Sequence, residues 1–253
     1  MQRPRPPVPD DDWALFLDVD GCLIDFADAP GAVVVPPGLR ECLSLLSSRL
    51  NGALALVSGR PLEVVDELFR PLRLPAAGMH GLEQRSPGRL LRAPRDGLAM
   101  RRMLAKAQAL ARRHPHAQVE DKGAGFALHW RAAPEAGSDL RAFAEDAIAR
   151  LPGYRLQHGD HVVELLPAGS DKGGAIEAFL GEAPFAGRVP AYAGDDLTDE
   201  AGFRVVNARA GISVLVGDRE GSEARFGLRD PADVRAWLGL PRSSVADHSP
   251  RRT

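Results

Sequence analysis

Residues 15–23 read L-F-L-D-V-D-G-C-L, an apolar run that leads directly into two aspartates and a glycine. The run predicts a buried β-strand, and because alternate residues of a strand share one face, Asp18 and Asp20 can converge at its carboxyl end. In an open parallel sheet, ligands bind at that end. One carboxylate can act there as a nucleophile and the other as a proton shuttle, with Mg²⁺ between them. The alternative is a strand followed by a chemically silent Asp-Gly turn.

Two further segments carry groups that suit a phosphate. Ser58 follows the apolar run 53–57 and precedes a helix that opens at Pro61, so a hydroxyl and free backbone N–H groups meet at a strand-to-helix turn. Lys172 stands at the start of a predicted helix over 173–180, where a cation opposes the helix dipole unless it holds an anion such as a transferring phosphoryl group. The alternatives are an ordinary N-cap turn and a solvated surface lysine.

An acidic segment follows the predicted strand 189–193. It reads G-D-D-L-T-D-E and holds four acids in six residues, which repel one another unless a cation or hydrogen bonds compensate. Hard carboxylate oxygens suit Mg²⁺ better than zinc, which makes Asp195, Asp196 and Asp199 candidate metal-site residues. The alternative is an acidic helix N-terminus, where carboxylates are favourable without a metal.

The order D-x-D, Ser, Lys and G-D-D-x-x-D, with each motif after a predicted strand, resembles the haloacid dehalogenase superfamily of phosphotransferases. Longer stretches resemble the trehalose-6-phosphate phosphatase family: G-M-H-G-L-E at 78–83, V-E-D-K-G-A-G-F-A-L-H-W-R at 119–131, V-E-L-L-P-A-G-S-D-K-G at 163–173 and G-D-D-L-T-D-E-A-G-F at 194–203. The similarity runs from about Trp13 to Trp237. It implies hydrolysis of trehalose 6-phosphate to trehalose and phosphate through an aspartyl-phosphate intermediate.

The resemblance also implies a division of labour among the acids. Asp18 would attack phosphorus, and Asp20 would protonate the departing sugar oxygen and then accept a proton from the hydrolytic water. Mg²⁺ would bind the Asp18 carboxylate, the Asp20 backbone carbonyl and Asp195. Asp199 and Asp196 would orient water bound to the metal.

Phosphate and sugar contacts follow from the same resemblance. Ser58 and Lys172 would hold phosphate oxygens. The expected sugar-binding residues are Glu120, Lys122, Arg131 and Glu164, with Arg60 and His80 as sugar or phosphate contacts at strand ends facing the same crevice. His129 and His161 are expected to be structural. The chain departs from the family at Cys22, where threonine is usual, and in its D-K-G-A-G run at 121–125, whose glycines leave fewer side chains for sugar contact.

The spacing of apolar residues predicts the fold class. A helical face at Leu39, Leu43 and Leu46 lies between the first strand and the strand at 53–57, and the closing third repeats this alternation. The pattern predicts an α/β fold with a Rossmann-like doubly wound parallel sheet. The middle third groups strands at 125–131 and 161–165 with two helices, which predicts an inserted α+β cap domain. We expect a discontinuous hydrolase core at 1–82 and 167–253, a cap at 83–166, and flexible ends at 1–12 and 241–253.

Composition limits the partners. The net charge of −2 and the absence of a basic stripe predict no nucleic-acid partner, and no apolar run approaches the roughly 20 residues that span a bilayer. The chain has two cysteines, too few for a disulfide framework, so we expect a cytoplasmic enzyme. The expected partner is a small sugar phosphate, and the expected state is a monomer or a weak homo-oligomer.

Alternatives remain open at this point. A phosphatase of another sugar phosphate, such as sucrose phosphate or mannosyl-phosphoglycerate, would share the core motifs, and a sugar phosphomutase would isomerise its substrate without net phosphate release. A signalling receiver domain combines similar residues but has no large cap. A non-catalytic binding protein would have no need to keep Asp18, Asp20, Lys172 and Asp195 together.

Overall fold

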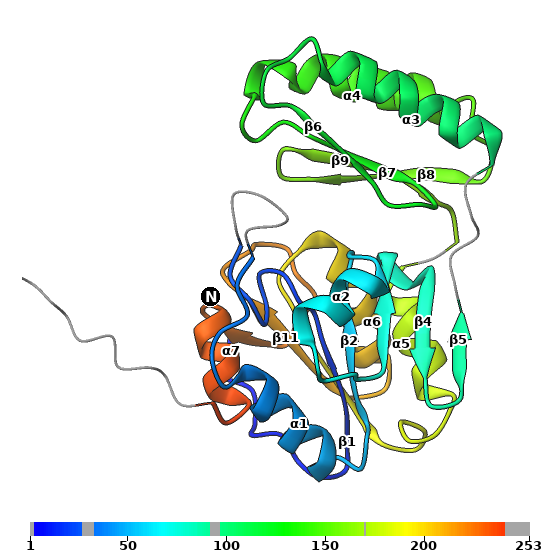
Figure 1. The fold of residues 1–253 in the computed structure, drawn as a ribbon. Helices are drawn as coiled ribbons and strands as arrows, with labels where there is room; N and C mark the ends of the chain where they lie inside the picture. Colours follow the sequence, from blue (N-terminus) through cyan, green and yellow to red (C-terminus); the bar gives the residue numbers. More distant parts are fainter. Residues whose placement is uncertain (1–2, 27–32, 92–96, 170, 241–253) are drawn as a thin grey trace, which may run out of the picture.

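The computed structural model describes residues 3–26, 33–91, 97–169 and 171–240 of the 253-residue chain. Within these segments the chain forms two sheets with flanking helices, a larger core and a smaller cap that lies above it in Figure 1. None of the helices in the described segments is long and apolar enough to cross a membrane.

The core sheet has eight strands in the order β12-β11-β10-β1-β2-β3-β4-β5. The first six are parallel, and they read as short, mostly buried apolar runs because helices cover both faces. The strands are β1 (Trp13–Leu17), β2 (Leu54–Val57), β3 (Ala76–Gly78), β4 (Glu83–Ser86), β5 (Arg89–Leu91), β10 (Val189–Gly194), β11 (Ile212–Val216) and β12 (Phe226–Leu228).

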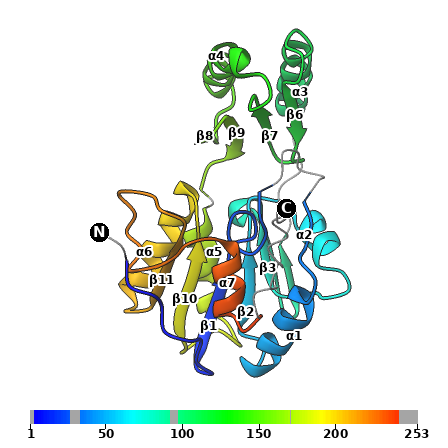
Figure 2. The ribbon, with the colours of Figure 1, turned by 90° about the vertical axis from the view of Figure 1, so that its left-hand side faces the viewer.

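The helices of the core lie on both faces of this sheet (Figure 2). They are α1 (Leu39–Arg49), α2 (Leu62–Phe69), α5 (Lys172–Leu180), α6 (Glu200–Ala208) and α7 (Pro231–Trp237), with the short 3₁₀ helices η2 (Met79–Gly81) and η4 (Leu197–Asp199). The chain runs outward from β1 in one direction and from β10 in the other. Because such crossovers are right-handed as a rule, α1 and α2 lie opposite α5 and α6. The carboxyl ends of β1 and β10 therefore meet at the switch point of the sheet, as predicted for a doubly wound fold.

The cap sheet is antiparallel, with strand order β6-β7-β9-β8. Helices α3 and α4 cover its outer face over a core of its own, which includes Phe126, Leu128 and Leu165. The opposite face is turned toward the core sheet. Since Glu120 pairs with Ala127, and Ala127 with Glu164, the two glutamates lie in one cross-strand row on that inner face. The elements are α3 (Leu98–Ala111), β6 (Gln118–Asp121), β7 (Phe126–His129), η3 (Pro134–Ala136), α4 (Gly137–Ile148), β8 (Tyr154–Gly159) and β9 (Val162–Pro167).

Residues 83–91 differ from the sequence-based prediction, which placed them in the cap. They form the hairpin β4–β5, and β4 pairs antiparallel with β3 of the core sheet. Gln84 and Ser86 point inward while their neighbours are half-exposed, so the strand carries polar residues on its buried side and lacks the apolar alternation that would reveal it. Gln84 Nε2 donates to the Ala175 carbonyl at 3.4 Å, which satisfies one of these buried groups.

The N-terminal segment also differs from the flexible lead-in that its prolines suggested. Arg3 Nε donates to the Ala224 carbonyl at 2.9 Å, and the Trp237 indole donates to the Pro7 carbonyl at 2.7 Å. Residues 3–12 thus lie against the core at several points. The expected flexible end at 241–253 lies outside the described residues.

Candidate active site

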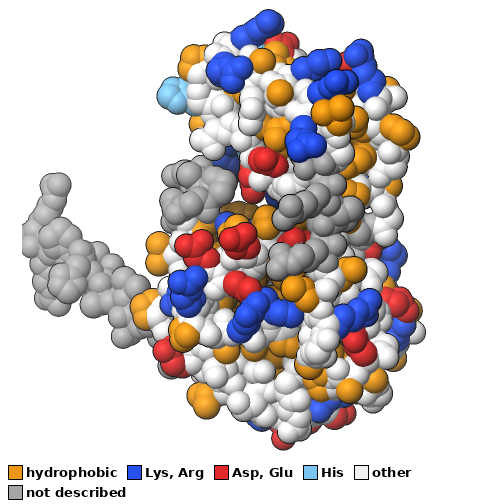
Figure 3. Space-filling view, turned by 45° about the vertical axis from the view of Figure 1, so that its right-hand side comes forward, with side chains coloured by type: hydrophobic (Ala, Val, Ile, Leu, Met, Phe, Trp, Pro, Cys, Tyr) orange, Lys and Arg blue, Asp and Glu red, His pale blue; other side chains and the backbone are white. Residues whose placement is uncertain are grey.

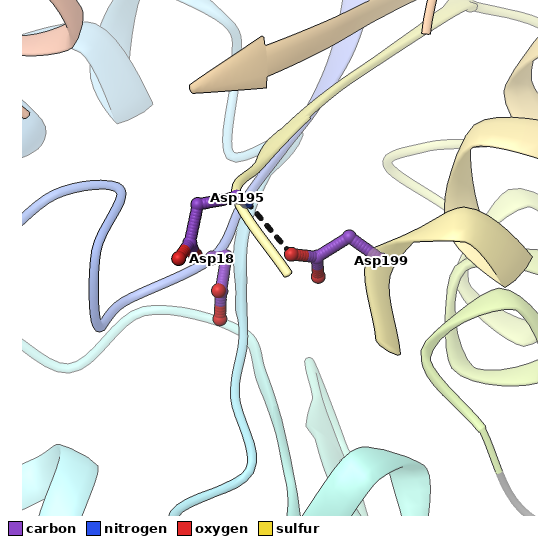
Figure 4. Close-up of side chains that lie close together, drawn as sticks. All are labelled: Asp18, Asp195 and Asp199. Carbon is purple, nitrogen blue, oxygen red and sulfur yellow. Dashed lines mark hydrogen bonds between the residues drawn. The ribbon is translucent and has the colours of Figure 1, made fainter. Parts of the chain in front are cut away.

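Three aspartates form an acidic cluster at the carboxyl edge of the core sheet (Figure 4). One carboxylate oxygen from each of Asp18, Asp195 and Asp199 lies within 4.8 Å of the other two. Parallel pairing of Leu17 with Ala193 brings Asp18, just after β1, beside the end of β10, from which Asp195 follows. Figure 3 shows acidic side chains gathered around a hollow between core and cap.

Lys172 is the cation of this cluster. Its Nζ lies 2.9 Å from Asp18 Oδ1 and 2.6 Å from Asp199 Oδ1, and its side chain is 3% exposed. Burial alone would lower the pKa of Lys172, but the charges of Asp18 and Asp199 raise it above its usual value. The unfavourable position at the start of α5 is therefore compensated by two carboxylates, and the ammonium stays charged.

Asp199 organises the loop that follows β10. Its Oδ2 accepts the backbone N–H groups of Asp195 and Asp196, each at 2.8 Å, and its Oδ1 accepts from Lys172 Nζ and the Tyr192 hydroxyl. Gly194 is required here, since a Cβ at that position would stand 2.4 Å from Asp199 Cγ. With four donors, Asp199 is suited to supporting a metal site rather than entering it.

Asp195 is the acid of the cluster that has a carboxylate oxygen available to a ligand. Its Oδ1 is buried and has no hydrogen-bond partner among the described residues. Burial, followed by repulsion from Asp199, raises the pKa of Asp195 to about 7. Burial likewise raises the pKa of Asp18, and although Lys172 opposes this, the pKa stays well above its ordinary value. Lys172 brings a single positive charge to three carboxylates, so Asp18 and Asp195 fit a divalent cation, which would supply the missing charge.

Asp20 lies outside this cluster and is held by Arg60. The guanidinium Nε and Nη2 donate to the two carboxylate oxygens of Asp20, each at 2.7 Å. The Asp20 carboxylate therefore pairs with Arg60 and does not belong to the acidic cluster. Gly21, at φ +73°, lets the loop turn there, and a Cβ on it would meet Asp195 Oδ2 at 2.3 Å.

Ser58 is buried in the turn after β2. Its Oγ accepts the backbone N–H of Arg60 at 3.1 Å, so the serine stabilises the turn and keeps its own hydroxyl proton for another acceptor. Cys22, in the place of the usual threonine, lies buried with its Sγ 3.5 Å from the Ala193 carbonyl of β10. That weak contact connects the loop after β1 to β10.

A second polar cluster joins cap and core. Lys122 Nζ lies 2.6 Å from Glu164 Oε1 and 3.8 Å from Glu120 Oε2, while His80 Nε2 of the core lies 3.0 Å from Glu164 Oε2. Burial alone would raise the pKa of Glu164, but the charge of Lys122 and the hydrogen bond with His80 hold it below its usual range. His129, expected to be structural, lies 3.0 Å from Glu120 and so also touches this cluster.

Two predicted site residues lie elsewhere. Arg131 is exposed and paired with Asp160 at 2.9 Å, because it follows the end of β7 and no longer shares the inward-facing alternation of the strand. Asp196 is outside the acidic cluster, since its side chain caps η4 and accepts the backbone N–H of Leu197. Tyr192 was missed. Its hydroxyl reaches Asp199, and its only sequence signal is an aromatic with a polar tip two residues before Gly194.

The doubly wound sheet, with carboxylates and a lysine at its switch point and a cap above them, defines a phosphatase of the haloacid dehalogenase class. Comparison with known proteins narrows the class. The chain belongs to the trehalose-phosphatase family, whose family model matches residues 16–232. The members of this family are phosphoric monoester hydrolases, and a sugar phosphate is the kind of substrate that the family implies.

Individual relatives are similar to this protein over most of its chain. It is 46% identical over 208 residues to the probable trehalose-phosphate phosphatase of Sinorhizobium fredii, covering 82% of this chain and 78% of the relative. It is 42% identical over 231 residues to the trehalose-6-phosphate phosphatase of Escherichia coli, covering 90% and 86%. Among solved structures, a trehalose-6-phosphate phosphatase related protein superposes with a TM-score of 0.73 at 26% identity, covering 88% of this chain and 94% of that one.

Proposed function

We propose that this chain is a Mg²⁺-dependent phosphatase that hydrolyses trehalose 6-phosphate to trehalose and phosphate through an aspartyl-phosphate on Asp18. The observation that carries the chemistry is the buried contact between Lys172 Nζ and Asp18 Oδ1. Beside it lies Asp195 Oδ1, which has no hydrogen-bond partner in the part of the chain that the structure describes. The names of the relatives support the choice of substrate. Asp18, Asp195 and the Asp20 backbone carbonyl would hold Mg²⁺, which would neutralise charge between the nucleophile and the phosphate.

The chain's own residues account for both halves of the reaction. A carboxylate oxygen of Asp18 attacks phosphorus and the bond from phosphorus to the sugar oxygen breaks. Asp20, which enters this step protonated and with one carboxyl oxygen released from Arg60, gives the sugar oxygen a proton. Asp20, oriented by Arg60, then takes a proton from water as the water oxygen attacks the phosphorus of the acyl phosphate. Phosphate leaves and the Asp18 carboxylate is restored. Lys172 and the Ser58 hydroxyl hold phosphate oxygens, with the lysine offsetting charge in both transition states.

Sugar recognition is assigned to the inner face of the cap. Glu120, Lys122 and Glu164 present charged donors and acceptors in a largely enclosed cluster above the turn that holds Ser58. Such groups discriminate strongly, because a sugar that lacks the matching hydroxyls leaves them desolvated and unpaired. The two free cysteines support a cytoplasmic enzyme, and the net charge of −2 supports the absence of a nucleic-acid partner. A monomer or a weak homo-oligomer is part of the proposal.

The test is phosphate release from trehalose 6-phosphate, sucrose 6-phosphate and glucose 6-phosphate, each with Mg²⁺ and with chelator. We expect rapid, Mg²⁺-dependent release from the trehalose ester and release at least about tenfold slower from the others. Equal rates on all three would retain the chemistry and reject the cap as the source of specificity. Isomerised sugar phosphate without free phosphate would identify a mutase instead.

Replacing the central cap carboxylate should weaken sugar binding. Glu164→Gln removes the charge that Lys122 and His80 both contact, so we expect KM for trehalose 6-phosphate to rise on the order of 10- to 100-fold, with a smaller change in kcat. Arg131→Met is the matched control, because Arg131 is exposed and pairs with Asp160 outside the cluster. Steady-state kinetics of both variants decide the matter, and an equal effect of Arg131→Met would contradict the assignment.

Metal binding should depend on pH through Asp195. Because its pKa is raised to about 7, the metal-free native state binds more protons than the unfolded chain between about pH 4 and 7, and its free energy of unfolding should fall as pH rises through that window. Mg²⁺ must displace the proton, so its affinity should weaken by about tenfold per pH unit below 7. Titration calorimetry and thermal unfolding at pH 5.5 and 7.5 measure both effects.

The control for this pH dependence is an aspartate of the same type on the cap surface. Asp146 lies exposed on α4, where it pairs with Arg150, and Asp146→Asn should leave both pH dependences unchanged. Asp195→Asn should abolish Mg²⁺ binding in the accessible range and reduce the pH dependence of stability, to which Asp18 still contributes. Mg²⁺ affinity that is the same at pH 5.5 and 7.5 would contradict the role given to Asp195.

A further inference from the structure

The core holds His80 in a fixed position beside the turn that contains Ser58, the proposed phosphate-binding turn. Its backbone is left-handed, with φ 55° and ψ 29°, a conformation in which histidine is among the better-tolerated side chains. Its N–H donates to the Ser58 carbonyl at 3.0 Å. The ring lies against Gly59, where a Cβ would stand 2.9 Å from both Cε1 and Nε2. The left-handed backbone of His80 and the absence of a side chain at Gly59 thus together fix the position of the His80 imidazole.

The imidazole is directed at the cap. Its Nε2 lies 3.0 Å from Glu164 Oε2 of β9, and the two side chains are 8% and 12% exposed. In a second contact a cap side chain reaches the core: Lys122 Nζ of the cap donates to the Gly59 carbonyl at 3.4 Å. Lys122 also holds the other oxygen of Glu164 at 2.6 Å. Both contacts therefore meet the core on the Gly59–His80 side of the site, next to Ser58.

We propose that His80 is a positioning residue that docks Glu164 onto the phosphate-binding turn, so that the sugar-recognising face of the cap is assembled together with the phosphate site of the core. The inference rests on the proposed function, since Glu164 is taken there as a sugar ligand. Without His80, Glu164 keeps its partner Lys122 within the cap but loses its bond to the core. The Glu164 carboxylate of the cap would then no longer be held in a fixed position relative to Ser58 and Asp18.

This role predicts a difference between substrates. A disaccharide phosphate must engage the cap and the phosphate site at once, so its binding depends on their alignment. A small aryl phosphate such as p-nitrophenyl phosphate needs only the core groups, Asp18, Lys172 and Ser58. Loss of the docking contact should therefore raise KM for trehalose 6-phosphate and leave p-nitrophenyl phosphate hydrolysis nearly unchanged.

The chain contains a matched control in His129. His129 Nε2 lies 3.0 Å from Glu120 Oε2, the same separation as in the His80–Glu164 pair. Both partners belong to the cap, and both are about a third exposed, at 30% and 31%. Replacing His129 removes a histidine–glutamate pair of the same length without removing a bond between cap and core.

The kinetic experiment compares His80→Gly, His80→Gln and His129→Gln in the Mg²⁺-loaded enzyme. Glycine removes the ring and relieves the left-handed backbone, and glutamine keeps an N–H donor with similar reach. We expect His80→Gly to raise KM for trehalose 6-phosphate by about tenfold or more, with less than about a twofold change in kcat/KM for p-nitrophenyl phosphate. His80→Gln should recover most of the loss. Equal losses on both substrates, or no recovery in His80→Gln, would overturn the proposal.

A second readout does not depend on trehalose 6-phosphate being the substrate. Spin labels at the exposed positions Leu45 on α1 and Gln108 on α3, in a Cys42→Ser background, report the distance between core and cap by electron–electron double resonance. His80→Gly should broaden the distance distribution and His129→Gln should not. If the chain turns over a different ester, this result alone still decides the docking role. An unchanged, narrow distribution in His80→Gly would overturn it while leaving the proposed function intact.

Discussion

Asp18→Asn should abolish phosphate release from trehalose 6-phosphate, with kcat lowered by a factor on the order of 10⁴ or more. The amide keeps the size and shape of the carboxylate but cannot attack phosphorus at a useful rate. The neighbouring carboxylates are not placed to substitute, because Asp199 is occupied by four donors, Asp20 is held by Arg60, and Asp195 is assigned to the metal. Phosphate release and acid-quench trapping of the acyl phosphate measure the effect, and trapping should succeed only with the native chain.

The same substitution should not destabilise the protein. Burial and the neighbouring acids raise the pKa of Asp18, so its charge is held at a cost in the metal-free protein. We expect the Tm of metal-free Asp18→Asn to equal or exceed that of the native chain at pH 7.5, which separates loss of chemistry from loss of fold. Asp146→Asn, an exposed aspartate, should match the native chain in both assays. Turnover retained within tenfold in Asp18→Asn would reject Asp18 as the nucleophile.

The acidic cluster could be predicted from sequence because strand geometry determines it. Asp18 and Asp195 follow two buried apolar runs, and parallel strands of a doubly wound sheet bring their carboxyl ends to one edge. Lys172 stood out because a cation at a helix start needs a nearby anion, and the structure supplies Asp18 and Asp199. The pattern of apolar runs and the need of each charge for an opposite partner were sufficient to predict these residues.

The pairing of polar side chains could not be predicted in the same way. Alternation assigns a residue to a face but does not say which partner it meets there, and so the sequence does not predict that Arg60 pairs with Asp20. Arg131 lies two residues past the end of β7, where alternation no longer applies. The hairpin β4–β5 buries polar side chains at the end of the core sheet and has no apolar pattern to reveal it.

Lys172→Met should have the largest effect on stability of any substitution at the site. Lys172 is the partner of Asp18 and Asp199 in a buried position, and removing one member of a buried ion pair leaves uncompensated charge that costs about 3–5 kcal/mol in free energy of unfolding. The variant should also lose most of its phosphatase activity, because Lys172 is the side-chain cation of the cluster that offsets the charge on the phosphoryl group. Urea unfolding of the metal-free protein at pH 7.5 measures the loss of stability.

The pH dependence of this variant shows whether electrostatics is the cause. Without the ammonium, the carboxylates should take up protons in the native state at a pH where the unfolded chain has released them. The native state then binds more protons, and stability should fall as pH rises from 5 to 7.5 more steeply than in the native chain. Adding Asp18→Asn to Lys172→Met removes one of the two stranded charges and should restore part of the stability with no activity. If Lys172→Met lost the same stability at both pH values, and Asp18→Asn restored none of it, the lysine would act through packing of its aliphatic stem rather than through its charge.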